Sequence, residues 1–159
     1  MKILQVTSTF SPLLGGQEKI VLELSKRLIK FGHKVTVLTS DFLLNEKFPE
    51  EDKIGKIKIF RFKNNLFLGG YGFSWKAFWW LINNYKNYDI IHFHGYNRFL
   101  TEIPIFFLKN KVPLIFTPAG FIHTKKNYIF KLIHDLTIGK IIKFVDICTA
   151  LTELDYKDY

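Results

Sequence analysis

Residues 2–39 read KILQVTSTFSPLLGGQEKIVLELSKRLIKFGHKVTVLT, and this stretch decides the fold. It opens with a short apolar run at residues 2–6, which is typical of a buried strand. Across residues 17–31 the apolar side chains recur at intervals of three and four, which predicts an amphipathic helix. Gly32 is placed to end that helix, and the β-branched run at residues 35–39 predicts a second strand.

The rest of the chain repeats this alternation. Further strands are predicted at residues 57–62, 89–93, 112–116 and 145–148, and further helices at 74–84, 101–109 and 127–143. Residues 40–56 are mixed and charged and are expected to form a long surface loop, and the alternation within 57–62 suggests an edge strand. Because short apolar strands alternate with helices, we expect an α/β fold with a doubly wound, Rossmann-like parallel sheet covered on both faces.

Length and composition bound the class of protein. The chain has 159 residues, of which 48% are hydrophobic, so one domain with a substantial core is expected. Lysine and arginine number 23 against 14 acidic residues, and the formal charge of +9 favours anionic partners. Nucleic acid is not expected, because no recognition helix, KH or RNP motif accompanies the scattered basic residues. The single cysteine, Cys148, is predicted to be buried and inert.

Nothing in the sequence resembles a targeting signal or a membrane span. The first residues turn polar at Thr7 instead of continuing into the apolar core of a secretory signal. The most apolar aromatic stretch, residues 77–82, is far shorter than the ~20 residues that cross a bilayer. We therefore expect a cytoplasmic protein, which could still be peripheral on the inner face of the membrane.

Aromatic side chains are concentrated between residues 67 and 80, flanked by Lys63 and Lys76. Only one stripe of a helix can face a sheet, so either Trp79 or Trp80 should point partly outward. Two interpretations stay open. The group is core packing, or part of it is a non-catalytic basic surface that docks on anionic membranes.

Small polar and imidazole-bearing residues follow the predicted strands. Ligands of an open parallel sheet bind beyond the carboxyl ends of its strands. The segments expected there are Thr7-Ser8-Thr9, Thr39-Ser40-Asp41, His92-Phe93-His94-Gly95, Thr117-Pro118-Ala119-Gly120 and Thr149-Ala150-Leu151-Thr152. This concentration predicts a binding site at that edge, with Thr117 and Gly120 among the candidate substrate-binding residues.

Gly15 and Gly16 precede the first helix. Unpaired N–H groups at a helix start attract phosphate or carboxylate, and glycine lets the backbone approach closely. The alternative is a loop that merely needs a positive φ angle. A nicotinamide cofactor is not expected, because a dinucleotide fingerprint would need G-x-G-x-x-G directly after the strand, whereas residues 8–14 intervene.

His92 and His94 lie two apart on a predicted strand and therefore share one face. With His123 as a third ligand they could hold a metal, and the protein would then be a metal-dependent hydrolase. In the alternative interpretation, one of the two histidines has a structural role. One imidazole would pack against a helix, while the other, at the strand end, bonds a substrate or a neighbouring loop.

Several stretches in order resemble the retaining GT-B glycosyltransferases of family four. They are residues 2–39 with the Gly15-Gly16-Gln17-Glu18 turn, the fourth-strand motif YDIIHFHG at 88–95, the fifth-strand motif VPLIFTP at 112–118, and residues 146–153. The resemblance spans nearly the whole chain. It implies that residues 1–159 form a single Rossmann-like acceptor-side domain, the amino-terminal half of a GT-B fold. The carboxy-terminal sugar-nucleotide domain would lie outside this chain.

The resemblance also implies a function. Such an enzyme transfers a hexose from a nucleoside-diphosphate sugar, its donor substrate, to a lipid-linked or saccharide acceptor, with no cofactor and no metal. The family's glycine loop lies near the donor diphosphate, which makes Gly15, Gly16 and Glu18 the carried-over positions. His94 is the strand-end catalytic candidate.

Two features depart from the family pattern. Family members commonly have histidine after the Thr-Pro of the fifth strand, where this chain has Ala119, and His123 is the candidate replacement. The glutamate pair of the donor domain, eight positions apart, has no counterpart here. Activity should need the missing domain, so the isolated domain is expected to be inactive.

Overall fold

The computed structural model describes residues 1–13, 15–41, 48–68, 71–96, 98–118, 132, 134 and 136–151. The elements in chain order are β1 Lys2–Thr7, α1 Gly16–Lys30, β2 Lys34–Ser40, β3 Glu51–Ile54, β4 Ile57–Phe62, β5 Leu66–Leu68, β6 Tyr71–Phe73, α2 Trp75–Asn84, η1 Tyr85–Asn87, β7 Ile90–His94, α3 Phe99–Leu108, β8 Leu114–Thr117, η3 Ile138–Phe144 and β9 Ile147–Cys148. The predicted alternation of strands and helices is confirmed.

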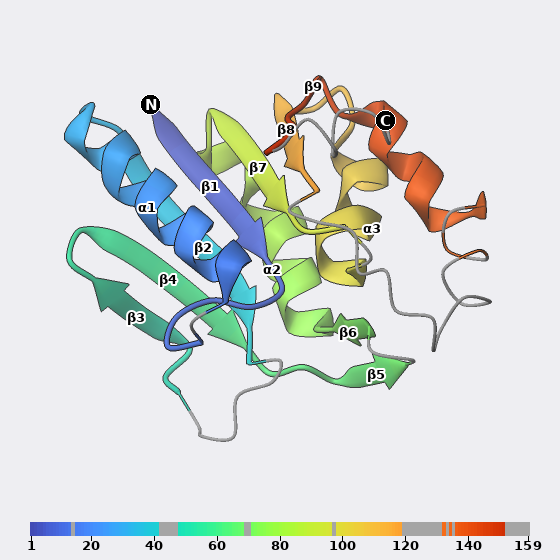
Figure 1. The fold of residues 1–159 in the computed structure, drawn as a ribbon, viewed down its shortest axis with the longest axis horizontal. Helices are drawn as coiled ribbons and strands as arrows, with labels where there is room; N and C mark the ends of the chain where they lie inside the picture. Colours follow the sequence, from blue (N-terminus) through green and yellow to red (C-terminus); the bar gives the residue numbers. More distant parts are fainter. Residues whose placement is uncertain are drawn as a thin grey trace.

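A seven-stranded sheet in the order β3-β4-β2-β1-β7-β8-β9 forms the centre of the molecule. All its pairings are parallel except that of β3 with β4. Figure 1 shows α1 on one face of the sheet and α2 and α3 on the other. The predicted doubly wound fold is therefore confirmed, and the carboxyl ends of the parallel strands meet at one edge.

Each face of the sheet has its own core. On the α1 face, Val21 of α1 packs with Val37 and Ile59 of the strands. On the opposite face, Leu81 of α2 and Leu100 of α3 join a larger cluster from the same strands. Strands buried on both faces read as continuous apolar runs, which is why β1 and β2 were recognisable in the sequence.

The sequence of α1 explains both of its ends. Gly15 precedes the helix in an extended conformation, and the helix closes after Lys30. Gly32 has a φ of +84°, and the N–H of His33 donates to the carbonyl of Leu28. This is the left-handed glycine cap that was predicted.

Two expectations about residues 40–62 are wrong. Glu51–Ile54 form a strand, β3, within the expected loop, and β4 lies between β3 and β2 instead of at the edge. β3 is antiparallel and half exposed, and three of its four residues are charged, so it carries no apolar signal. Its carboxylates reach basic partners on β4, with Arg61 Nη1 3.6 Å from Asp52 Oδ2.

Helix α2 begins as predicted. The N–H of Ala77 donates to Ser74 Oγ at 3.2 Å, and the rings of Phe73 and Phe78 lie 5.9 Å apart across the helix start. Trp79 is the outward-pointing tryptophan, 56% exposed, whereas Trp80 packs on Phe60 with ring centroids 4.4 Å apart. The short β5–β6 hairpin before α2 was not predicted.

The last described elements are short. Of the helix expected at 127–143 the structure describes only part, ending in the 3-10 helix η3. Cys148 is exposed on β9, so the prediction of a buried thiol is wrong. The reason is topological, because β9 is a two-residue strand at the sheet edge with both side chains outside. Within the described ranges, no helix is long and apolar enough to cross a bilayer.

Candidate functional site

The strand register assembles a polar row at the carboxyl edge of the sheet. His94 of β7 is paired with Thr7 of β1 on one side and with Thr117 of β8 on the other. Thr39 of β2 is paired with Arg61 of β4. All five side chains are buried, and they share the α1 face because strand side chains alternate. The predicted gathering of polar strand ends is thus confirmed for the described residues.

The two strand histidines lie on one face, as predicted. Their ring centroids are 3.9 Å apart, and each Nε2 has a protein partner. His92 Nε2 shares a hydrogen bond of 2.7 Å with Thr117 Oγ1, and His94 Nε2 donates to the side-chain oxygen of Gln5. Nδ1 of His94 is buried and has no partner among the described residues. These imidazoles therefore join β1, β7 and β8 to one another.

Burial keeps both imidazoles neutral. It lowers the pKa of His92 to about 4, and it lowers the pKa of His94 well below the ordinary value, with the neighbouring His92 adding to the effect. His94 is only 1% exposed. Its predicted role as a catalytic residue stays a prediction, and the contacts seen here are those of a positioning residue.

Stability should fall in mild acid because of these two histidines. Their depressed pKa values mean that the unfolded chain binds protons more readily than the folded chain below about pH 6.5. Above that pH, protonation of these histidines therefore does not affect the free energy of unfolding. The free energy falls as the pH drops toward 4, by at most about 1.4 kcal/mol per pH unit for each histidine. Urea unfolding across this range should show the slope, and His92→Gln should reduce it. An unchanged slope would contradict the assignment.

Neither glycine at the start of α1, Gly15 before it or Gly16 as its first residue, is required by its backbone angles. Gly15 has a φ of −96°, and Gly16 is not among the glycines with positive φ. The alternative that the loop needs positive φ is therefore wrong. A Cβ atom added at Gly16 would meet no atom of the described residues within 4 Å, so the space directly over this residue is open there. Open backbone at a helix start is what a bound anion would use.

Glu18 closes the turn between β1 and α1. Thr9 Oγ1 donates a hydrogen bond to Glu18 Oε1, and a Cβ added at Gly15 would lie 2.2 Å from Glu18 Oε2. The carboxylate thus lies in the first turn of α1, where it interacts favourably with the helix dipole. Its predicted contact with a phosphate is not tested by this geometry, in which it holds the loop.

Gln17 connects the helix start to two strand ends, a role that sequence reasoning missed. Its Nε2 donates to Thr7 Oγ1 at 2.8 Å and to the carbonyl of His94 at 3.1 Å. Gly95 has a φ of +97°, and a Cβ there would lie 2.8 Å from the Gln17 amide. The positive φ therefore favours glycine at position 95, and a larger residue would also displace the Gln17 amide from its bonds. The position of Gly95 directly after the polar end of β7 was the one sequence feature that could have indicated this close contact.

Two further contacts hold the β1–α1 loop from the β2–β4 side. Ser40 Oγ donates to the carbonyl of Ser8 at 2.8 Å, and Arg61 Nη2 donates to the carbonyl of Ser11 at 2.5 Å. Arg61 is 3% exposed, so its guanidinium acts inside the protein. The loop that carries Gly15 and Gly16 is thus anchored to both halves of the sheet.

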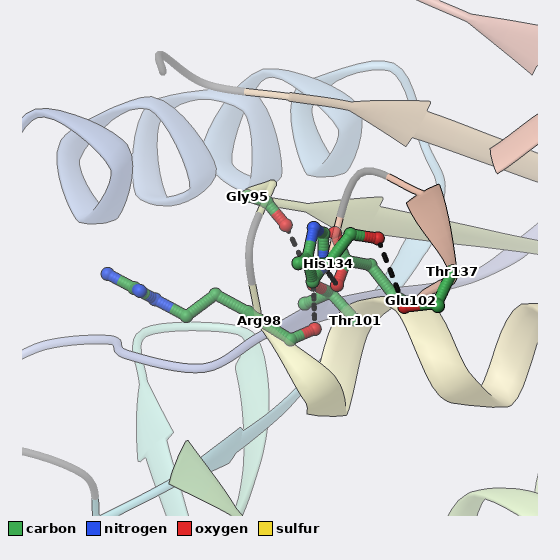
Figure 2. Close-up of polar contacts among 6 residues, drawn as sticks. All are labelled: Gly95, Arg98, Thr101, Glu102, His134 and Thr137. Carbon is green, nitrogen blue, oxygen red and sulfur yellow. Dashed lines mark hydrogen bonds and ion pairs between the residues drawn. The ribbon is translucent and has the colours of Figure 1, made fainter. Parts of the chain in front are cut away.

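A buried pair of side chains joins α3 to residue 134. His134 Nε2 and Glu102 Oε2 are 2.7 Å apart, with 4% and 0% of their side chains exposed. Figure 2 shows this pair beside Thr101, whose Oγ1 donates to the carbonyl of Gly95 at 2.7 Å. His134 thus has a structural contact with α3.

Three residues of the predicted site lie outside the described part of the chain. They are Ala119, Gly120 and His123, and the structure says nothing of their place. Thr117 is described and bonds His92 and Thr149. In the portion of the chain that the structure describes, no three His, Cys, Asp or Glu side chains come together as metal ligands. The hydrolase alternative rests on His123, and elemental analysis of the purified protein for zinc, manganese and iron tests it.

Comparison with solved structures finds the same fold in several enzymes of low sequence identity. Sucrose-phosphate synthase from Thermosynechococcus elongatus superimposes with a TM-score of 0.62 at 16% identity, covering 92% of this chain and 41% of that one. The E. coli trehalose-6-phosphate synthase bound with UDP-2-fluoro glucose gives 0.57 at 14%, covering 99% and 41%. An alpha-glucosyltransferase in complex with UDP and a 13-mer DNA gives 0.54 at 16%, covering 94% and 37%.

The chain spans about two fifths of the length of these solved structures. At such low identity the likeness establishes the fold alone. No curated protein sequence matches the chain significantly. The sequence profile described as Glycosyltransferase Family 4 matches residues 14–154, which is most of the chain. The chain therefore belongs to glycosyltransferase family 4, and it has the fold of an amino-terminal GT-B domain.

Proposed function

We propose that this chain is the acceptor-side domain of a retaining glycosyltransferase. The enzyme would move a hexose from a nucleoside-diphosphate sugar to a lipid-linked or saccharide acceptor. The observation that carries the proposal is the open backbone at Gly16, at the start of α1 beside the polar row. Family membership supports glycosyl transfer, and the solved relatives bound with UDP or UDP-2-fluoro glucose support a nucleotide sugar as donor.

The donor site would be shared with a second domain. A helix start typically contributes about 0.3–1 kcal/mol to a bound anion, whereas micromolar affinity needs about 8 kcal/mol. The short coverage of the solved relatives agrees with a partner domain outside this chain. We infer that the isolated chain is inactive and binds nucleotide feebly.

Each part of the site has a role in this proposal. Gly16 lets the donor diphosphate approach the N–H groups of α1. Gln17 holds the start of α1 to the carbonyl of His94, and the neutral His94 ring holds β7 to Gln5 of β1. The loops at this edge would thereby present a constant geometry to the acceptor. Donor sugar, nucleotide and acceptor would be selected by the loops beyond this edge and by the second domain.

The experiment is a transfer assay with the full-length enzyme. Nucleoside-diphosphate hexoses are supplied with membrane extract or saccharide acceptors, and nucleotide release and the anomeric configuration of the product are followed by NMR. The expected product keeps the configuration of the donor, and the isolated chain produces none. An inverted product would contradict the retaining mechanism. Failure to consume any nucleotide sugar would contradict the proposed function.

A further inference from the structure

The outer surface of α3 has the wrong polarity for a helix that faces water. Its exposed side chains are Phe106 and Phe107, 48% and 46% exposed. The polar Thr101 and Glu102 of the same helix are buried. A surface helix ordinarily buries its apolar stripe and exposes its polar one. The outer face of α3 is therefore apolar, as is typical of a surface that contacts another apolar surface.

Helix α2 extends this surface. Trp75 and Trp79 are 55% and 56% exposed. Phe78 connects the two helices, because its ring lies 5.3 Å from that of Trp79 and 5.4 Å from that of Phe107. We call Trp75, Trp79, Phe106 and Phe107 the aromatic face. Figure 1 shows α2 and α3 on the side of the sheet opposite α1.

Positive charge borders the aromatic face. Lys109 Nζ lies 4.6 Å from the Phe106 ring centroid and 4.1 Å from that of Phe144, and Lys143 lies 5.1 Å from the Phe144 ring. Neither lysine forms an ion pair with a described residue. The ammonium group of Lys109 thus lies over two aromatic rings, and that of Lys143 lies over one.

Acidic charge is scarce on the same side. Asp89 and Glu102 are the only acidic residues between positions 75 and 111. Glu102 is buried against His134, and Asp89 accepts from the backbone N–H of Lys2 at the start of β1. At the edge of the face, Glu50 and Glu51 line a hollow together with Trp79, and they are paired with Lys76 and Lys58 respectively. Lysines without matching carboxylates favour a negatively charged partner.

We propose that the aromatic face docks on the surface of an anionic lipid bilayer. The tryptophan and phenylalanine rings would enter the boundary between headgroups and acyl chains, and Lys109 and Lys143 would lie at the headgroup phosphates. Aromatic side chains with a lysine border fit this interface better than a neutral protein surface. Docking on a bilayer would favour a lipid-linked acceptor over a soluble saccharide, and only this step rests on the proposed function.

The three tryptophans of the chain make the face directly observable. All of them, Trp75, Trp79 and Trp80, lie in α2. Intrinsic fluorescence of the 159-residue chain therefore reports on this face. We expect a blue shift and flotation with vesicles of phosphatidylcholine and phosphatidylglycerol, and much weaker flotation with phosphatidylcholine alone. Neither measurement requires transferase activity, so failure here is distinguishable from failure of the proposed function.

Matched variants separate the face from general charge. Phe106→Ser with Phe107→Ser should weaken vesicle binding about tenfold, and Lys109→Glu should weaken it severalfold. The control is Phe31→Ser, which removes a more exposed phenylalanine, 79% exposed, at the end of α1. This control should bind as the unchanged chain does, and circular dichroism verifies that each variant is folded.

Four outcomes would overturn the proposal. The chain could fail to float with either vesicle, or the Phe31 variant could lose binding as much as the double variant. Flotation without a blue shift would mean that a basic protein adsorbs through charge alone. Concentration-dependent dimers in the absence of lipid, abolished in the double variant, would assign the aromatic face to contact between two copies of the chain.

Discussion

Gly16→Val is expected to lower sugar transfer by the full-length enzyme about a hundredfold while leaving the domain folded. The backbone of Gly16 has no positive φ, and an added Cβ would meet no atom of the described residues within 4 Å, so we expect the fold to accept valine. It would instead fill the space that the proposed donor diphosphate needs. Initial rates of nucleotide release measure the loss, and thermal unfolding of the isolated domain tests the fold.

Gly16→Ala is a matched control in which stability should rise while sugar transfer falls. Alanine in the first turn of α1 should stabilise the domain by about 0.4–1 kcal/mol, because it restricts the unfolded chain. It should nevertheless lower transfer, although less than valine does. Turnover unchanged in both variants would mean that the space over Gly16 takes no part in binding the donor. Unfolding of the domain by valine would show that the space is not open.

Glu102→Ala is expected to destabilise the domain by about 3 kcal/mol. Glu102 and His134 are both buried and lie 2.7 Å apart, so removal of the carboxylate leaves a buried imidazole without this partner (Figure 2). The pair joins α3 to the segment that leads into η3. Urea unfolding of the isolated domain, followed by circular dichroism, measures the change.

Glu23→Ala is the comparison for that measurement. Glu23 and Lys26 also lie 2.7 Å apart, but about half of each side chain is exposed. Exposed ion pairs contribute little to stability because solvent screens them, so this variant should lose far less stability than Glu102→Ala. Equal losses in the two variants would mean that burial does not set the strength of the Glu102 contact.

The fold was predictable where the signal is local. The apolar strand at the chain start, the three-and-four spacing of α1 and the Gly32 cap each depend on neighbours in sequence, and each was placed within a residue or two. β3 could not be found in this way. Its sequence is mostly charged, and it is a strand through its antiparallel pairing with β4, on which Lys58 and Arg61 supply partners for its carboxylates.

The candidate site was predictable in outline and not in its contacts. Strand ends and the glycine turn follow from the order of the elements, and the shared face of His92 and His94 follows from the period of a strand. The partner of His94 is Gln5, which is separated from it by 89 positions, and Gln17 bonds the His94 carbonyl across 77 positions. Such pairings depend on strand register, which the sequence alone does not specify.

An NMR titration of the isolated chain with UDP tests the central claim most directly. The claim is that the start of α1 faces the donor diphosphate but cannot hold it alone. We expect amide shifts concentrated at Gly15, Gly16 and Gln17, with affinity no tighter than about millimolar, because a helix start contributes far less than micromolar binding requires. Shifts confined to another part of the domain, or tight binding by this chain alone, would contradict the account.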